Sequence, residues 1–224
     1  MKIELLEHAS IRLSDDMVIY IDPYDIKEEY KDADYIFITH DHYDHYDSES
    51  IDKVSKEDTK IILPKCLEKR KHDLLVEPNN HYKIDNLSFD TIPSYNIDKQ
   101  YHPKEKEYVG YNILLNDCYY YIMGDTDRTP ETDKVKTDVC FVPIGGTFTM
   151  NVEEAADYIN DIKPVKAIPI HYGKIVGEKS LGTKFKNMVD DNIEVEVLIG
   201  DWCWKAKRAK RKISWCSFWW NCRS

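Results

Sequence analysis

A run of six residues, His40-Asp41-His42-Tyr43-Asp44-His45, constrains this chain more than any other feature of its sequence. The run follows residues 35–38, whose β-branched and aromatic content predicts a strand. Because alternate side chains of extended backbone share a face, His40 and His42 can reach one ion. A turn just beyond them could direct Asp44 and His45 toward a second ion. Imidazole and carboxylate donors suit zinc, iron or manganese, so the run predicts a metal centre at the end of a strand.

Two more candidate ligands follow other predicted strands. Asp125 lies in Gly124-Asp125-Thr126-Asp127 after residues 118–123, and His171 follows residues 165–170. Taken singly, an aspartate in such a turn is usually a turn cap, and a lone histidine after a strand is usually structural. Beside the first run we expect both to be ligands, with the Asp125 carboxylate bridging two cations about 3.5–4 Å apart.

These motifs resemble the metallo-β-lactamase superfamily of hydrolases: Thr-His-x-His-x-Asp-His after a strand, then Gly-Asp-Thr, then His-Tyr-Gly. Three further motifs resemble its stand-alone branch, which includes ascorbate-6-phosphate lactonase and N-acylphosphatidylethanolamine phospholipase D. They are Glu7-His8-Ala9-Ser10, Tyr20-Ile21-Asp22-Pro23 and Pro143-Ile144-Gly145-Gly146-Thr147. The resemblance covers residues 1 to about 200. It implies an α+β fold, a four-layer αββα sandwich with a dinuclear site at one edge.

The resemblance also implies how the ligands divide. His40 and His42 would hold the first ion, Asp44, His45 and His171 the second, and Asp125 would bridge them. The family usually supplies a third histidine to the first ion from the loop after the strand at residues 87–93. Here that loop begins Ser94-Tyr95-Asn96, and its first histidine is His102. Either His102 reaches the ion, or Asn96 is a weak oxygen ligand, or solvent fills the position; we favour His102.

Other residues are expected around the metals. His8 is assigned a role in binding substrate or in supporting the ligands. Asp22 is expected to orient a metal-binding histidine, since such ligands commonly donate their other N–H to a carboxylate. Asp127 and Tyr172 are expected to line the pocket. The Gly145-Gly146 pair could offer backbone N–H groups to an anion, or could simply form a tight turn.

The predicted chemistry is metal-assisted hydrolysis, in which water shared by two divalent cations becomes hydroxide near neutral pH. Asp44 and Asp125 are the candidate catalytic residues. Zinc is the first choice of metal, with manganese, iron and nickel as alternatives. The expected substrate is a small, anionic phosphodiester, lactone or ester. A metal-binding scaffold of the same fold without catalysis is the competing hypothesis, because it would explain the missing family histidine.

Composition limits the partners and the location. The formal net charge is -10, and seven Lys/Arg against one Asp from Asp201 onward leave -16 on the preceding residues. So acidic a body repels nucleic acid, and a small-molecule substrate is expected instead. The start of the chain shows no signal peptide, and no stretch reaches the roughly 20 apolar residues of a membrane span, so we expect a cytoplasmic protein. The six cysteines, none in C-x-x-C spacing, are expected to be reduced.

The last segment, residues 201–224, differs from the rest. It combines a basic run with all five tryptophans and three cysteines of the chain. A membrane-binding segment is one interpretation. We favour a non-native extension and place the boundary of a single domain at residue 200.

Short patterns predict the other elements. Helices are expected at residues 48–55, capped by Ser48, and at residues 64–72, 152–162 and 181–189. A hairpin turn is expected at Asn116-Asp117. The number of strands in both halves predicts two sheets packed face to face with helices outside.

Overall fold

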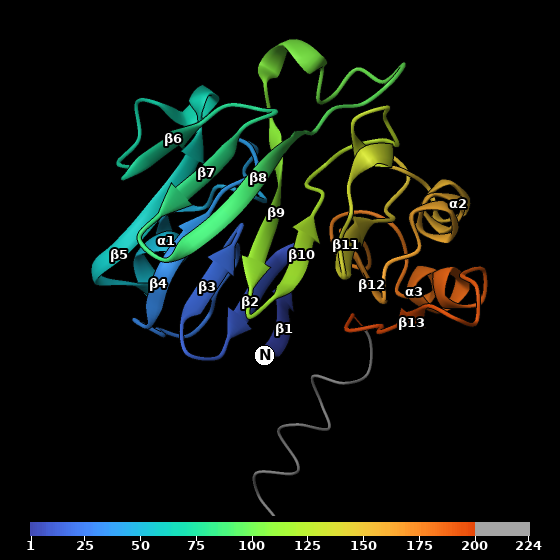
Figure 1. Ribbon diagram of the computed structural model, residues 1–224, viewed down its shortest axis with the longest axis horizontal. Coiled ribbons are helices and arrows are strands. Elements are labelled where there is room, and N and C mark those ends of the chain that lie inside the picture. Colours follow the sequence, from blue (N-terminus) through green and yellow to red (C-terminus); the bar gives the residue numbers. More distant parts are fainter. Residues whose placement is uncertain (200–224) are drawn as a thin grey trace, which may run out of the picture.

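The computed structural model describes residues 1–199, which form two β-sheets with helices on their outer faces (Figure 1). The predicted tail at residues 201–224, with Cys203, Cys216 and Cys222, lies outside the described residues. Cys66, Cys118 and Cys140 are free thiols, as expected. Within the described residues, no helix is both long and apolar enough to cross a membrane.

The first sheet contains six strands in sequence order. Two antiparallel pairings join β1, β2 and β3, and parallel pairings join β3, β4, β5 and β6. Its strands are β1 (Lys2–Glu7), β2 (Ser10–Ser14), β3 (Val18–Ile21), β4 (Ala33–Phe37), β5 (Ser55–Pro64) and β6 (Leu74–Val76). Helix α1 (Ser48–Val54) connects β4 to β5.

The second sheet contains seven strands, also adjacent in sequence order. Strands β7 to β10 pair antiparallel, and β10 to β13 pair parallel. They are β7 (His81–Ile84), β8 (Leu87–Pro93), β9 (Val109–Leu115), β10 (Cys118–Ile122), β11 (Val139–Pro143), β12 (Lys166–Ile170) and β13 (Glu194–Val195). The crossover helices are α2 (Val152–Ile162) and α3 (Ser180–Lys186).

Three buried clusters separate the four layers. The central cluster takes apolar side chains from both sheets, and Phe37 of β4 packs edge-on against Phe89 of β8 and Tyr111 of β9, each at 5.0 Å. A second cluster lies between the second sheet and α2 and α3, and a third between the first sheet and α1. The expected αββα sandwich is therefore confirmed.

Local signals explain several boundaries. Asn151 caps α2 by accepting a hydrogen bond from the Glu154 backbone N–H at 2.9 Å, and the Glu154 carboxylate accepts from the Asn151 N–H at 2.8 Å. Asn116 and Asp117 form the turn between β9 and β10, both at left-handed φ, as the two-residue hairpin requires.

Two local predictions were wrong. Residues 64–72 form no α-helix: only Lys65–Leu67 is helical, as a 3-10 turn (η1), and β6 follows at Leu74. The charged run between them carries no apolar stripe for a helix to bury. The cap of α1 is Asp47 rather than Ser48, because the Asp47 carboxylate accepts from the Glu49 backbone N–H.

Candidate metal centre

The carboxyl ends of three strands bring the predicted ligands to one edge of the sandwich. The histidine-rich run follows β4, Asp125 follows β10, and His171 follows β12 directly. After β4 the chain turns back on itself, because the backbone N–H groups of His45 and Tyr46 both donate to the carbonyl of His42. The turn brings the His45 ring to 4.0 Å from that of His40.

The potential ligand atoms fall into three overlapping groups, each within 4.8 Å. The first group is His40, His42 and His102. The second is His8, Asp44, His45 and His171. The third is His40, His45 and Asp125. The loop histidine His102 thus lies beside His40 and His42, where the sequence left three alternatives open.

Asp125 lies between the first and the second group. Its carboxylate oxygens are 2.9 Å from Nε2 of His171, 3.3 Å from that of His45 and 3.4 Å from that of His102. The corresponding distance to His40 is 3.9 Å. One carboxylate therefore faces histidines of both groups, as a bridging ligand must.

Unsatisfied polar atoms test whether these residues suit a metal. Five histidine Nε2 atoms are buried without a hydrogen-bond partner, as is Oδ1 of Asp125. The histidines are His8, His40, His45, His102 and His171. A buried polar atom without a partner costs about 1–3 kcal/mol, so a cluster of them needs a reason. Nitrogen lone pairs facing two carboxylates fit divalent cations.

Hydrogen bonds on the far side of two rings leave their Nε2 atoms free to bind a cation. Asp22 Oδ2 lies 2.7 Å from Nδ1 of His45 and accepts from the Thr39 hydroxyl at 2.7 Å. The Thr39 oxygen in turn lies 2.9 Å from Nδ1 of His40. In the tautomers with the proton on Nδ1, both rings point a lone pair at the cluster.

Burial and mutual charge set the protonation of the site. Burial lowers the pKa of His8 and of His102 to about 4, so both rings are neutral and able to bind metal. Burial opposes ionisation of Asp125, but the neighbouring His171 and His45 hold its pKa well below the usual value. Burial also opposes ionisation of Asp44, but the neighbouring imidazoles of His171 and His8 lower its pKa.

The backbone is strained at the same place. His8, Asp22, His102 and His171 all have left-handed φ, between 46° and 59°. Non-glycine residues rarely adopt this conformation, and such strain clusters at functional sites.

Other predicted pocket residues lie outside the ligand groups. The Asn96 amide nitrogen lies 3.0 Å from the Tyr101 carbonyl, 2.6 Å from the Phe148 carbonyl and 3.1 Å from Nδ1 of His102. Asn96 therefore holds the loop that carries His102. Asp127 pairs with Lys99, and Tyr172 donates from its hydroxyl to the Ile199 carbonyl.

The glycine pair after β11 forms a tight turn. The Gly146 backbone N–H donates to the Met150 carbonyl, so this group is already engaged. A Cβ on Gly145 would lie 2.5 Å from the His171 carbonyl oxygen. Gly145 is therefore required for the close approach of its turn to His171.

Sequence reasoning missed one aromatic neighbour of the site. Tyr108 precedes β9, its ring lies 5.1 Å from that of His40, and its hydroxyl donates to Asp41 at 2.6 Å. This pairing takes up the one acidic residue of the run that joins no ligand group. The tyrosine carried no local signal, since its partner is 67 residues away.

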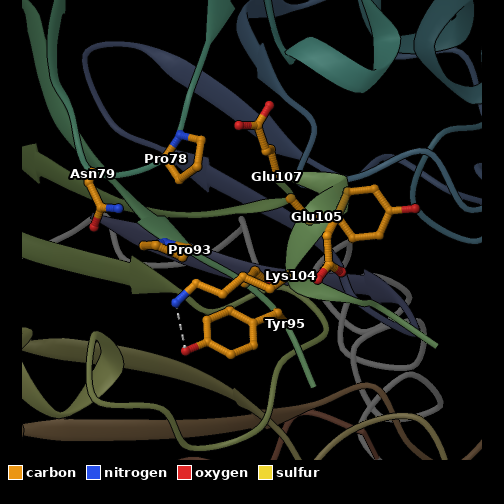
Figure 2. Close-up of a pocket in the computed structure, with 9 residues that line it drawn as sticks. Pro78, Asn79, Pro93, Tyr95, Lys104, Glu105 and Glu107 are labelled. Carbon is orange, nitrogen blue, oxygen red and sulfur yellow. Dashed lines mark hydrogen bonds between the residues drawn. The ribbon is translucent and has the colours of Figure 1, made fainter. Parts of the chain in front are cut away.

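A cavity of about 310 Å³ adjoins this tyrosine (Figure 2). It is lined by the segment between β6 and β7, the end of β8 and the loop between β8 and β9, whose Tyr95 and Lys104 are joined by a 3.2 Å hydrogen bond. None of the candidate ligands lines it, so the cavity is separate from the metal centre.

Comparison with protein families fits this geometry. The model of the beta-lactamase superfamily domain matches residues 2–171, which include every candidate ligand. The chain belongs to the metallo-β-lactamase superfamily. It is a metal-dependent hydrolase of that superfamily.

Relatives and solved structures agree with this assignment. A UPF0173 metal-dependent hydrolase of Pyrococcus horikoshii is 29% identical over 88% of this chain and 96% of its own length. A UPF0173 protein of Pyrococcus furiosus is 34% identical over 77% of this chain and 84% of its own. A crystal structure from Parabacteroides distasonis superposes with a TM-score of 0.76 at 29% identity, over 87% of this chain and 91% of its own.

Proposed function

We propose that this metallo-β-lactamase superfamily member hydrolyses a small, anionic phosphodiester, lactone or ester with two divalent ions, zinc being the first candidate. The position of Asp125 carries the proposal. Its carboxylate faces histidines of the first and the second ligand group within 3.9 Å.

In this proposal His40, His42 and His102 hold one ion and Asp44, His45 and His171 hold the other. When bound, such ions lower the pKa of water toward roughly 7 and polarise a substrate oxygen. The protein's part is to fix the ligands: Asp22 and Thr39 orient His45 and His40, and burial keeps the rings of His40 and His102 neutral.

Asp44 and Asp125 are the residues placed to hold a proton during the reaction. Asp44 Oδ2 is 3.7 Å from Nε2 of His171 and 3.9 Å from that of His45. Because both carboxylates stay ionised beside these histidines, each can accept a proton and return it to the leaving group.

The competing scaffold hypothesis loses its main support. It rested on a missing third histidine for the first ion, and His102 lies beside His40 and His42 in the ligand group. The acidic body repels long polyanions, whereas a small anionic substrate could be held by the bound metal ions.

The test combines metal analysis with a substrate screen. Purified protein should contain two equivalents of metal per chain and hydrolyse at least one compound in a panel of phosphodiesters, lactones, esters and thioesters. His42→Ala and Asp125→Ala should lose metal and turnover together. His81→Ala is the matched control, since that histidine is exposed and pairs only with Asp90 among the described residues.

Two outcomes would contradict the proposal. Full turnover in a metal-free His42→Ala/Asp125→Ala double variant would exclude metal-assisted hydrolysis. Two bound ions with no turnover on any class of the panel would favour a scaffold.

A further inference from the structure

His8 occupies a position that the ligand assignment above does not use. It lies in the turn between β1 and β2, on a different part of the chain from every other candidate ligand. Its side chain is fully buried, and its ring lies 4.0 Å from that of His171. Its carbonyl accepts the His171 backbone N–H at 3.2 Å, which fixes the two residues side by side.

The ring nitrogens of His8 have no hydrogen-bond partner. Nδ1 and Nε2 are both buried and unpaired, whereas Nδ1 of His45 has Asp22. Nε2 of His8 points at Asp44 Oδ2 from 3.4 Å, which is longer than a normal nitrogen–oxygen hydrogen bond. A structural histidine in a core would be expected to satisfy at least one of its nitrogens.

The surroundings of His8 match those of a ligand. One of its ring nitrogens falls within the same 4.8 Å group as ligand atoms of Asp44, His45 and His171. Because no part of the side chain is exposed, direct contact with a substrate outside the cluster explains its position less well.

We propose that His8 is a direct ligand of the second metal ion, together with Asp44, His45 and His171. The inference rests on the proposed two-metal function and adds a fourth terminal ligand to one of its sites. The second ion then has three histidines and Asp44 besides the bridging Asp125. The first ion would be held by three histidines and the bridge, one protein ligand fewer than the second ion.

The experiment compares stepwise metal affinities. Metal-free protein is titrated with zinc in competition with a chromophoric chelator, for the wild type and for His8→Phe, which keeps an aromatic ring and removes both nitrogens. A second variant, His8→Asn, tolerates the left-handed backbone. His81→Phe is the surface control, and His42→Ala identifies the binding step that belongs to the first ion.

The expected result is selective. His8→Phe and His8→Asn should weaken one of the two binding steps by at least about tenfold, the loss typical of removing even a supporting partner of a ligand. The other step, the one lost in His42→Ala, should stay within a factor of two or so of the wild type. Circular dichroism of the metal-free proteins should show unchanged folding.

Cobalt separates a ligand from a residue that only positions Asp44. In the cobalt-loaded wild type, each ligating imidazole with an exchangeable proton gives a paramagnetically shifted N–H resonance. Loss of one such resonance in His8→Phe, with the remaining set retained, supports ligation. An unchanged set of resonances would mean that His8 is not a ligand.

The remaining outcomes are equally decisive. Unchanged affinity for both ions in His8→Phe would overturn this inference and leave the two-metal function standing. Equal weakening of both steps would also overturn it, because it would indicate a general packing effect. A wild-type protein that binds no zinc would overturn both the inference and the proposed function.

Discussion

Asp22 holds His45 and the end of β4 with a single buried carboxylate. Oδ2 lies 2.7 Å from Nδ1 of His45, and Oδ1 accepts the Thr39 backbone N–H at 2.8 Å. The orientation of a candidate metal ligand and the path of the chain into the histidine-rich run therefore depend on the same group.

Asp22→Asn should weaken metal binding without removing a ligand. An amide has only one oxygen, so its NH₂ group takes the place of one of the two carboxylate oxygens. Facing the Thr39 N–H, it would lose that hydrogen bond; facing His45, it would donate to Nδ1 and favour the tautomer that cannot bind through Nε2. The expected loss of zinc affinity is about 10- to 100-fold, measured by chelator competition.

A second His–Asp pair provides the control for this change. His81 and Asp90 form the same contact, at 2.8 Å, on the exposed edge of the second sheet. Asp90→Asn should leave zinc affinity unchanged. Equal affinity in the Asp22→Asn protein and the wild type would show that the carboxylate does not orient His45.

Gly145→Ala should damage the site through packing alone. The new Cβ would lie 2.5 Å from the His171 carbonyl oxygen and 2.8 Å from a Val176 methyl carbon, so the His171 backbone has to move. We expect weaker binding of one zinc ion, because a shift of that backbone displaces a ligand.

Gly146→Ala separates packing at the site from strain in the turn. Gly146 has φ of 84°, and a Cβ there would meet only Asn151, at 3.6 Å, so alanine strains the backbone by about 1–2 kcal/mol without touching His171. Its melting temperature should fall while its zinc affinity is retained. If both glycine variants bound zinc as tightly as the wild type, the close approach at Gly145 would have no role in the site.

Local sequence patterns predicted the parts of the site that lie next to strand ends. The run after β4 was recognisable because it places four potential ligands within six residues. Asp125 and His171 follow the strands β10 and β12, which both pair parallel with β11, so that their carboxyl ends lie at one edge. The boundaries of β8 and α2 were also predicted, because strand composition and the helical spacing of apolar residues lie within the element itself.

Contacts between distant residues could not be predicted in the same way. The grouping of His8 with Asp44 depends on how the β1–β2 turn packs beside the end of β12, and no local pattern reports that. The strand β6 was missed because its three residues gain their structure from pairing with β5. Residues 64–72 before it have a composition that favours a helix, but they lack the apolar stripe that a helix would bury.

Glu131 should contribute a small, acid-sensitive share of stability. Hydrogen bonds from Lys104 and Tyr95 lower its pKa to about 2, below the ordinary value of 4.5. A lowered folded-state pKa stabilises the protein fully above the unfolded value, and the contribution is lost as the pH falls from about 4.5 toward 2.

Glu131→Gln is the variant that tests this dependence. Because the pair is partly exposed, its loss should cost less than about 1 kcal/mol near neutral pH. Urea unfolding of metal-free wild type and variant at pH 6 and pH 3.5 should show a difference that shrinks at the lower pH. Glu105→Gln, on a residue without an ion pair in the described part of the chain, should show no such trend, and a constant difference would exclude the assigned pairing.

Tyr111→Phe should lower stability without changing metal content. The buried Tyr111 hydroxyl of β9 donates to the Ile38 carbonyl at 2.7 Å, which joins the second sheet to the end of β4, two residues before His40. Phenylalanine keeps the ring packing against Phe37 but leaves that carbonyl without this donor, at a cost of about 1–2 kcal/mol. In a protein of this size the melting temperature should fall by roughly 2–8 °C, while both zinc ions remain bound.

Tyr119→Phe, on a partly exposed ring of β10, is the control and should leave the melting temperature unchanged. Loss of a zinc equivalent in Tyr111→Phe would instead show that this bond between the sheets positions the histidine run itself.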